Sequence, residues 1–217
     1  MFKFIKILLR QIQETIERNL VSLRLQELIW KLRHFYRIGW AEKNLKSFDY
    51  YHREQIVCAV KKFKNITTII EVGFGSAPNL INLRQQFPKA RLLGIDINPR
   101  AVKVAKNYFS SKKEKNVELK VGNIDKIEIL TKSVDVVLSD AVLMYIPPDR
   151  IVKVLKELCR IANKGLIFNE YNKQGLGKEG YFYGGCWVYD FKFLLKKLLP
   201  KSKIKLLKSS MSKQQGA

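Results

Sequence analysis

The sequence contains few of the residues that build metal centres or disulfide frameworks. Its 217 residues include three cysteines and two histidines. The cysteines, Cys58, Cys159 and Cys186, lie far apart and form no Cys-x-x-Cys pair, which argues against a zinc site or a disulfide scaffold and indicates a reducing compartment. Two histidines are too few for a multi-histidine centre, so we expect no bound metal.

Long hydrophobic runs are also missing. No uninterrupted apolar stretch approaches the roughly 20 residues that span a bilayer. The first residues are interrupted by Lys3, Lys6 and Arg10 and offer no small-residue cleavage site, so they do not match a secretory signal peptide. These absences predict a cytoplasmic protein.

Acidic residues are scarce relative to basic ones. The chain has 41 Lys and Arg against 19 Asp and Glu, which gives a formal net charge of +22. Such an excess predicts attraction to an anionic partner, which can be nucleic acid, an acidic lipid surface or a phosphorylated substrate. Because 47% of the residues are hydrophobic, the chain can still bury a core, and wholesale disorder is excluded.

Residues 1–38 contain neither glycine nor proline and carry apolar residues three or four positions apart, from Ile5 to Leu23. This spacing predicts an amphipathic helix with a basic polar face. Such a helix can pack on the domain, form a homodimer, or lie on the anionic inner face of a membrane. We therefore divide the chain into a basic helical extension (1–40), an α/β domain (41–210) and a polar tail (211–217).

From residue 65 onward, strand and helix patterns alternate. Strands are predicted at 65–72, 90–96, 117–122, 134–139 and 166–169, with helices at 78–87, at 99–112 and from 147. This order predicts a doubly wound α/β fold, in which a mostly parallel sheet of six or seven strands carries helices on both faces. Residues 170–187 are rich in glycine and aromatics and predict a flexible loop. A last helix near 188–199 precedes a strand candidate at 203–208.

Four successive predicted strands end in residues typical of ligand sites. These ends are Glu71-Val72-Gly73-Phe74-Gly75, Asp96-Ile97, Gly122-Asn123-Ile124-Asp125 and Ser139-Asp140-Ala141-Val142-Leu143. Glycines at a turn let backbone approach a ligand closely. Because ligands bind at the carboxyl edge of doubly wound sheets, the four ends together predict a nucleotide-like ligand, with the second-strand carboxylate on a ribose.

Two common nucleotide motifs do not fit. A dinucleotide fingerprint needs a third glycine where Pro78 stands, and no Gly-x-x-x-x-Gly-Lys-[Ser/Thr] loop is present. In order and spacing, the four segments instead resemble the motif series of class I S-adenosylmethionine-dependent methyltransferases, over roughly residues 40–200. The resemblance implies S-adenosylmethionine as the cofactor.

The resemblance also implies roles for the residues at the strand ends. Gly73, Phe74 and Gly75 would receive the methionine portion, and Glu71 would lie near its amino group. Asp96 would bind the ribose hydroxyls, while Ile97, Asn123 and Ile124 would surround the adenine. Asp140 would lie near the ammonium and the reacting methyl group.

Methyl transfer from a sulfonium is a direct in-line displacement, which needs a general base only when the nucleophile is a hydroxyl or a protonated amine. The candidates for that base are Asp140, His52 and Glu170. Residues expected to contact the acceptor are Arg53, Tyr145, Tyr183 and Trp187. We expect a small-molecule, lipid-linked or glycan acceptor.

Two alternatives stay open. The basic surface suits an RNA or DNA methyltransferase, although the [Asn/Asp]-Pro-Pro-[Tyr/Phe] motif is absent after the fourth strand and no cysteine follows a proline. A non-catalytic scaffold that only binds cofactor is the other alternative.

Overall fold

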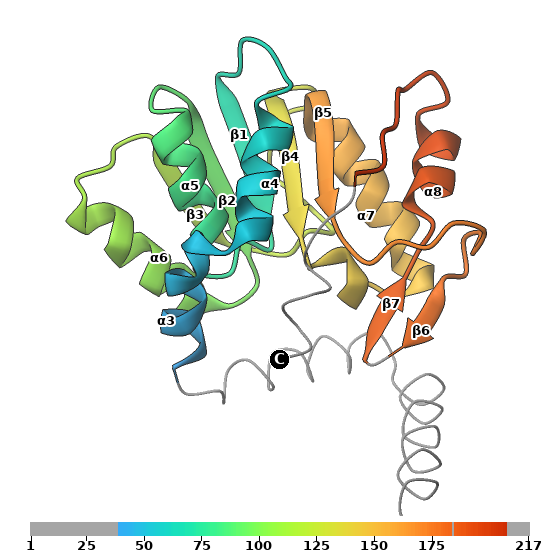
Figure 1. Cartoon of the computed structure of the whole chain (residues 1–217), viewed down its shortest axis with the longest axis horizontal. Coiled ribbons are helices and arrows are strands. Elements are labelled where there is room, and N and C mark those ends of the chain that lie inside the picture. Colours follow the sequence, from blue (N-terminus) through green and yellow to red (C-terminus); the bar gives the residue numbers. More distant parts are fainter. Residues whose placement is uncertain (1–38, 184, 208–217) are drawn as a thin grey trace, which may run out of the picture.

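The computed structural model describes residues 39–183 and 185–207, so the predicted N-terminal helix and the polar tail lie outside the described residues, and the division of the chain near residue 40 stays a prediction. The principal strands are β1 (Thr68–Val72), β2 (Arg91–Asp96), β3 (Val117–Val121), β4 (Val134–Asp140) and β5 (Ala162–Asn169). They form one parallel sheet in the order β3-β2-β1-β4-β5, which confirms the α/β prediction (Figure 1).

Helices cover both faces of this sheet. The helical elements are α3 (Trp40–Leu45), η1 (Lys46–Asp49), α4 (Tyr51–Val60), α5 (Pro78–Gln86), α6 (Pro99–Ser111), η2 (Leu143–Tyr145), α7 (Pro148–Ile161) and α8 (Phe191–Leu198). Side chains alternate between the faces of a strand, so Ile69 packs with α4, α5 and α6, whereas Ile70 packs with α7 and α8. None of the described helices combines the length and apolar character needed to cross a bilayer.

Local sequence explains where the helices begin. Pro78, Pro99 and Pro148 stand in the first turns of α5, α6 and α7, where a missing backbone N–H costs nothing. At α6 the side chain of Asn98 also accepts hydrogen bonds from the amides of Arg100 and Ala101. The starts of α5 and α6 follow β1 and β2, and that of α7 follows β4 and η2, so all three limit the turns at the carboxyl edge of the sheet.

The number of strands differs from the prediction of six or seven. The described residues form a five-stranded sheet and a separate antiparallel hairpin of β6 (Tyr181–Tyr183) and β7 (Cys186–Val188), within the segment predicted to be a loop. The strand predicted at 203–208 is wrong over its described part, because residues 203–207 belong to no strand. Ile204 packs against the apolar cluster while Lys203 and Lys205 are exposed. An irregular segment with one side against the core therefore shows the same alternation of apolar and basic residues as a strand.

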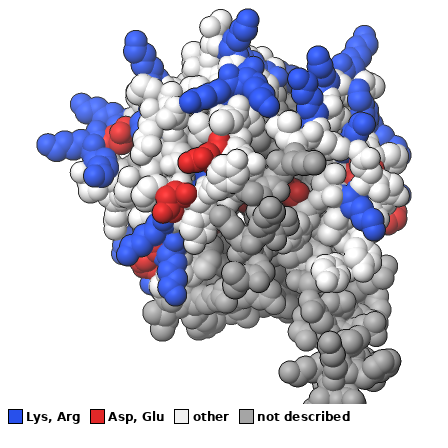
Figure 2. Space-filling view, in the orientation of Figure 1, with Lys and Arg blue, Asp and Glu red and all other residues white. Residues whose placement is uncertain are grey.

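The order of strands reverses at β1, which pairs with β2 on one side and β4 on the other. The chain therefore leaves β1 and β4 in opposite directions and opens a crevice at their carboxyl ends. Lysines gather at the opposite, amino-terminal edge, in the segments that enter the strands (Figure 2). This lysine edge comprises the exposed residues Lys61, Lys62, Lys64, Lys89, Lys113, Lys115, Lys132 and Lys164.

Candidate active site

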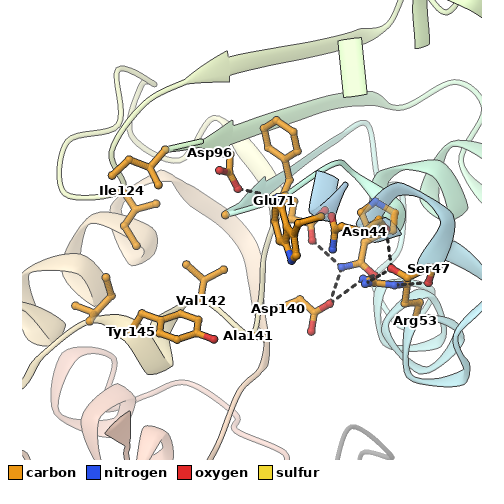
Figure 3. Close-up of a pocket in the computed structure, with 18 of the residues that line it drawn as sticks. Asn44, Ser47, Arg53, Glu71, Asp96, Ile124, Asp140, Ala141, Val142 and Tyr145 are labelled. Atoms are coloured by element: carbon orange, nitrogen blue, oxygen red, sulfur yellow. Dashed lines mark hydrogen bonds and ion pairs between the residues drawn. The ribbon is translucent and has the colours of Figure 1, made fainter. Parts of the chain in front are cut away.

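A cavity of about 480 Å³ lies in the crevice at the carboxyl edge of the sheet (Figure 3). The cavity brings together most of the predicted site residues, namely His52, Arg53, Glu71, Gly73, Phe74, Gly75, Asp96, Ile97, Asn123, Ile124, Asp140 and Tyr145. They come from α4, from η2 and from the ends of β1, β2, β3 and β4. The structure thus assembles the four strand ends into one site, while the role of each residue stays a prediction.

The turn after β1 requires glycine. Gly73 and Gly75 have φ angles of +68° and +58°, in the left-handed region that residues with a Cβ rarely adopt. A Cβ at Gly73 would lie 2.2 Å from Val142 Cγ2, and one at Gly75 would lie 2.6 Å from Asn44 Oδ1. The close approach of Val142 and Asn44 therefore leaves room only for backbone at the wall of the cavity.

Asp96 joins the end of β2 to this turn. One carboxylate oxygen accepts the Gly75 amide and the other accepts the Asn98 amide, each at 2.7 Å. Asp96 is only 3% exposed, and burial raises its pKa to about 6, against the two amide hydrogen bonds that lower it. The carboxylate is thus held in place at the cavity wall, where its expected contact with a ribose stays a prediction.

Glu71 and Asp140 are linked by a residue that the sequence analysis missed. Asn79 Nδ2 donates to Glu71 Oε1 at 2.6 Å and to Asp140 Oδ2 at 2.9 Å. Burial raises the pKa of Glu71 to about 8, although the hydrogen bond from Asn79 opposes the shift. The second oxygen of Glu71, Oε2, is buried in the cavity wall without a hydrogen-bond partner. Buried polar atoms are normally paired, so this oxygen is suited to a donor from a ligand.

Arg53 supplies the positive charge of the same network. Its Nη1 donates to Asp140 Oδ2 and to Asn79 Oδ1, both at 3.0 Å. Its Nε and Nη2 donate to the backbone oxygen and hydroxyl of Ser47, at 2.7 and 2.9 Å. Arg53 lines the cavity as predicted, but its hydrogen bonds are directed into the protein, so its clearest task is to hold Asp140.

The two candidate catalytic residues lie close together. His52 Nε2 is 3.8 Å from Asp140 Oδ2. The other oxygen of Asp140 accepts the Asn169 amide group at 2.7 Å. Asp140 is therefore fixed from α4, α5 and β5 and presents a carboxylate beside an imidazole, an arrangement suited to proton transfer.

Three predicted residues do not line this cavity. Trp187 is buried in the cluster around α7 and α8, where its ring lies near those of Phe182 and Tyr189. Tyr183 is 57% exposed and stacks on Tyr181. Part of the glycine-rich segment folds into the β6–β7 hairpin, which keeps both residues out of the cavity lining, so their contact with the acceptor stays a prediction. Glu170, a candidate base, turns away from the cavity and accepts the Ser139 hydroxyl instead.

Comparison with known proteins agrees with this architecture. Residues 63–187, more than half of the chain, match a family model described as a methyltransferase domain. An uncharacterised protein of Rickettsia prowazekii is 29% identical over 105 residues, which cover 48% of this chain and 42% of the relative. Arsenite methyltransferase of Halobacterium salinarum is 24% identical over 99 residues, or 45% of this chain and 25% of that protein. The matches thus span less than half the length of either relative.

Solved structures share the fold. A methyltransferase in complex with the Trm112 methyltransferase activator, from Haloferax volcanii, has a TM-score of 0.56 at 21% identity, covering 73% of this chain and 72% of that one. Geranyl diphosphate C-methyltransferase from Streptomyces coelicolor has a TM-score of 0.57 at 12% identity, covering 76% and 65%. By its match to the family model, supported by the order of its strands and the site at their carboxyl ends, the chain belongs to the class I S-adenosylmethionine-dependent methyltransferases.

Proposed function

We propose that this protein transfers the methyl group of S-adenosylmethionine to a small-molecule, lipid-linked or glycan acceptor. The observation that carries the proposal is a single cavity in which Glu71, Asp96 and Asp140 meet His52. Three carboxylates lining one cavity of a chain with net charge +22 suit a ligand that carries cationic groups and hydroxyls. S-adenosylmethionine supplies a methyl group already activated on a cationic sulfur.

The half of the cavity near β1, β2 and β3 would hold the cofactor. Gly73 and Gly75 would present bare backbone to the cofactor, because Val142 and Asn44 occupy the space that side chains there would need. Glu71 Oε2 is available to an ammonium group. Asp96 would accept ribose hydroxyls. The apolar side chains of Ile97 and Ile124, with Asn123, would bind the adenine.

The half near α4 and η2 would hold the acceptor. His52 would take the proton lost by a hydroxyl or amine nucleophile, and the Asp140 carboxylate would stabilise the resulting imidazolium. Tyr50 and Tyr145 line this half and supply flat apolar walls that exclude water from the acceptor.

The placement of charge supports a small acceptor over nucleic acid. The eight lysines of the lysine edge lie at the opposite end of the strands from the cavity. Around the cavity, Arg150 is paired with Asp125 and Arg53 with Asp140, and Lys43 is a further basic residue of the lining. The lysine edge would therefore attract a phosphate backbone to the end of the domain that lies away from the site.

The test has two stages. Calorimetric titration of the full chain with S-adenosylmethionine, S-adenosylhomocysteine and NAD should show binding of the first two and not of NAD. Transfer of an isotopically labelled methyl group should then label a fraction of small molecules, lipids or glycans. Binding of neither sulfur ligand would overturn the proposal, and label confined to RNA or DNA would overturn the acceptor class.

A further inference from the structure

Glu170 makes a set of contacts that the proposed chemistry does not use. It directly follows β5, and its carboxylate reaches the segment that follows β4. Its Oε1 accepts the Ser139 hydroxyl at 2.7 Å and the Val142 amide at 3.0 Å. Its Oε2 accepts the amides of Val142 and Met144 at 3.1 and 3.3 Å. One carboxylate thus binds the backbone of this segment at two successive points.

The segment held by Glu170 forms one wall of the active-site cavity. Ala141, Val142 and Tyr145 all line the cavity (Figure 3). Val142 also packs so closely over Gly73 that a Cβ there would collide with it. A displacement of the segment would therefore disturb both the turn that receives the cofactor and the wall facing the acceptor.

The backbone of this segment needs such an anchor. Ala141 has a φ of +55°, a left-handed conformation that costs a residue with a Cβ of the order of 1 kcal/mol or more. The Ala141 amide donates to the backbone oxygen of Asn169 at 3.0 Å. Asn169 and Glu170 together hold the strained turn from the end of β5, and the Glu170 contacts are those that depend on charge.

We propose that Glu170 is a positioning residue for methyl transfer: its ionised carboxylate holds residues 141–145 against the cofactor turn, and its protonation loosens them. The proposal rests on the proposed function. Protonation would place a hydrogen on one of the two oxygens, and that oxygen would then lose its role as an acceptor for the amides of Val142 or Met144.

Glu170 changes charge in an accessible range of pH. Burial raises its pKa to about 7, against the hydrogen bonds from Ser139 and the backbone amides, while the nearby charge of Asp140 raises it further. On its other side, Glu170 lines a second cavity together with the lysines Lys132, Lys164, Lys192, Lys203 and Lys205. The hydrogen bonds from Ser139 and the amides lower the pKa of the buried carboxyl, whereas burial raises it. Relative to a Glu170 that stays buried without these contacts, the contacts with residues 141–145 therefore strengthen as the pH rises through about 7.

The experiment measures the dissociation constant of S-adenosylhomocysteine for the full chain between about pH 6 and pH 8. Glu71 and Asp96 also titrate near this range, with pKa values of about 8 and about 6, so the informative quantity is the difference between variants. Relative to the unsubstituted chain, Glu170→Gln should bind about tenfold more weakly at pH 8 and equally at pH 6, since charge-assisted hydrogen bonds are lost only where Glu170 is ionised.

Two further variants sharpen the test. Ser139→Ala removes the hydroxyl that favours the ionised carboxylate, so the pH at which affinity rises should move upward. Asp135→Asn is the matched control, because Asp135 likewise accepts a backbone amide, that of Thr67 at 2.7 Å, but at the opposite end of β4. Its pH profile should overlay that of the unsubstituted chain.

Each result decides between the proposals. If Glu170→Gln follows the profile of the unsubstituted chain, the positioning role is overturned while the proposed function stands. If the unsubstituted chain binds no S-adenosylhomocysteine at any pH, the proposed function itself fails. If circular dichroism shows that Glu170→Gln does not fold, the decision passes to Ser139→Ala, whose unshifted profile would equally overturn the role.

Discussion

The side chain of Val142 occupies the space that a Cβ at Gly73 would need, with Val142 Cγ2 only 2.2 Å from that position. The two residues belong to the ends of β1 and β4, which are neighbours in the sheet. Their contact closes the crevice behind the cavity. The segment after β4 and the turn at residues 73–75 therefore pack directly against each other.

Gly73→Ala should therefore weaken binding of S-adenosylhomocysteine and destabilise the fold. The added methyl meets Val142, and alanine is strained at a φ of +68°, so we expect a loss of about 2–4 kcal/mol in the free energy of unfolding, measured by urea titration. Gly175→Ala is the matched control, because Gly175 also has a positive φ, +86°, but nothing lies within 4 Å of its Cβ position. Equal losses in the free energy of unfolding of both variants would show that the close contact between Gly73 and Val142 contributes nothing.

Asp96→Ala should abolish most of the affinity for S-adenosylmethionine. Loss of a charge-assisted contact with the ribose predicts about 2–3 kcal/mol, or about 30-fold to 150-fold in the dissociation constant. Asp190→Ala provides the control, since Asp190 is also a buried carboxylate that accepts two amides, those of Gly175 and Phe193. Both variants should lose stability. An unchanged affinity of Asp96→Ala for S-adenosylmethionine would refute the ribose assignment.

The ligand-free protein should become less stable as the pH rises from about 5 to about 8. Burial raises the pKa values of Glu71, Glu170 and Asp96 to about 8, about 7 and about 6, so the folded state retains protons that the unfolded chain has already released. The free energy of unfolding is then greatest at pH values below the pKa values of these groups in the unfolded chain. It falls as the pH rises toward their pKa values in the folded protein. Urea titrations across this range would show it, and Glu71→Gln should flatten the decline at its upper end.

His52→Asn should slow methyl transfer without weakening the binding of S-adenosylhomocysteine. If the acceptor is a hydroxyl or a protonated amine, loss of the base predicts a decrease of about 10²-fold in kcat. A normal rate in this variant would show that the acceptor needs no base or that Asp140 alone removes the proton. Tyr50→Phe, a neighbouring ring in the same wall, is the matched control and should leave kcat nearly unchanged.

The sequence predicts the strand ends well because one short segment encodes each of them. Glu71, Asp96 and Asp140 each lie at the carboxyl end of a buried strand, and parallel strands place these ends at one edge of the sheet whatever the details of packing. The links among them are not encoded locally. Asn79 bridges Glu71 and Asp140 across 8 and 61 positions, and only the docking of α5 on the sheet brings its side chain there.

The differences between the predicted and the observed placement of Trp187 and Glu170 have a similar origin. Glycines and aromatics near Trp187 suggest a loop over the acceptor, because composition does not reveal whether aromatic rings pack inward. In the structure the hairpin places Trp187 in the core. The position of Glu170 after a strand predicts a residue facing the cleft. Its direction depends instead on the Ser139 hydroxyl of β4 and on the Val142 and Met144 amides of the segment after β4.

The lysine edge lies at the opposite end of the strands from the carboxylate-lined cavity. An anionic surface would attract the lysine edge, which would leave the mouth of the cavity facing away from that surface. In that orientation the cavity is open to the surrounding solution, so a lipid-linked acceptor would have to leave that surface, or belong to another one, to enter it.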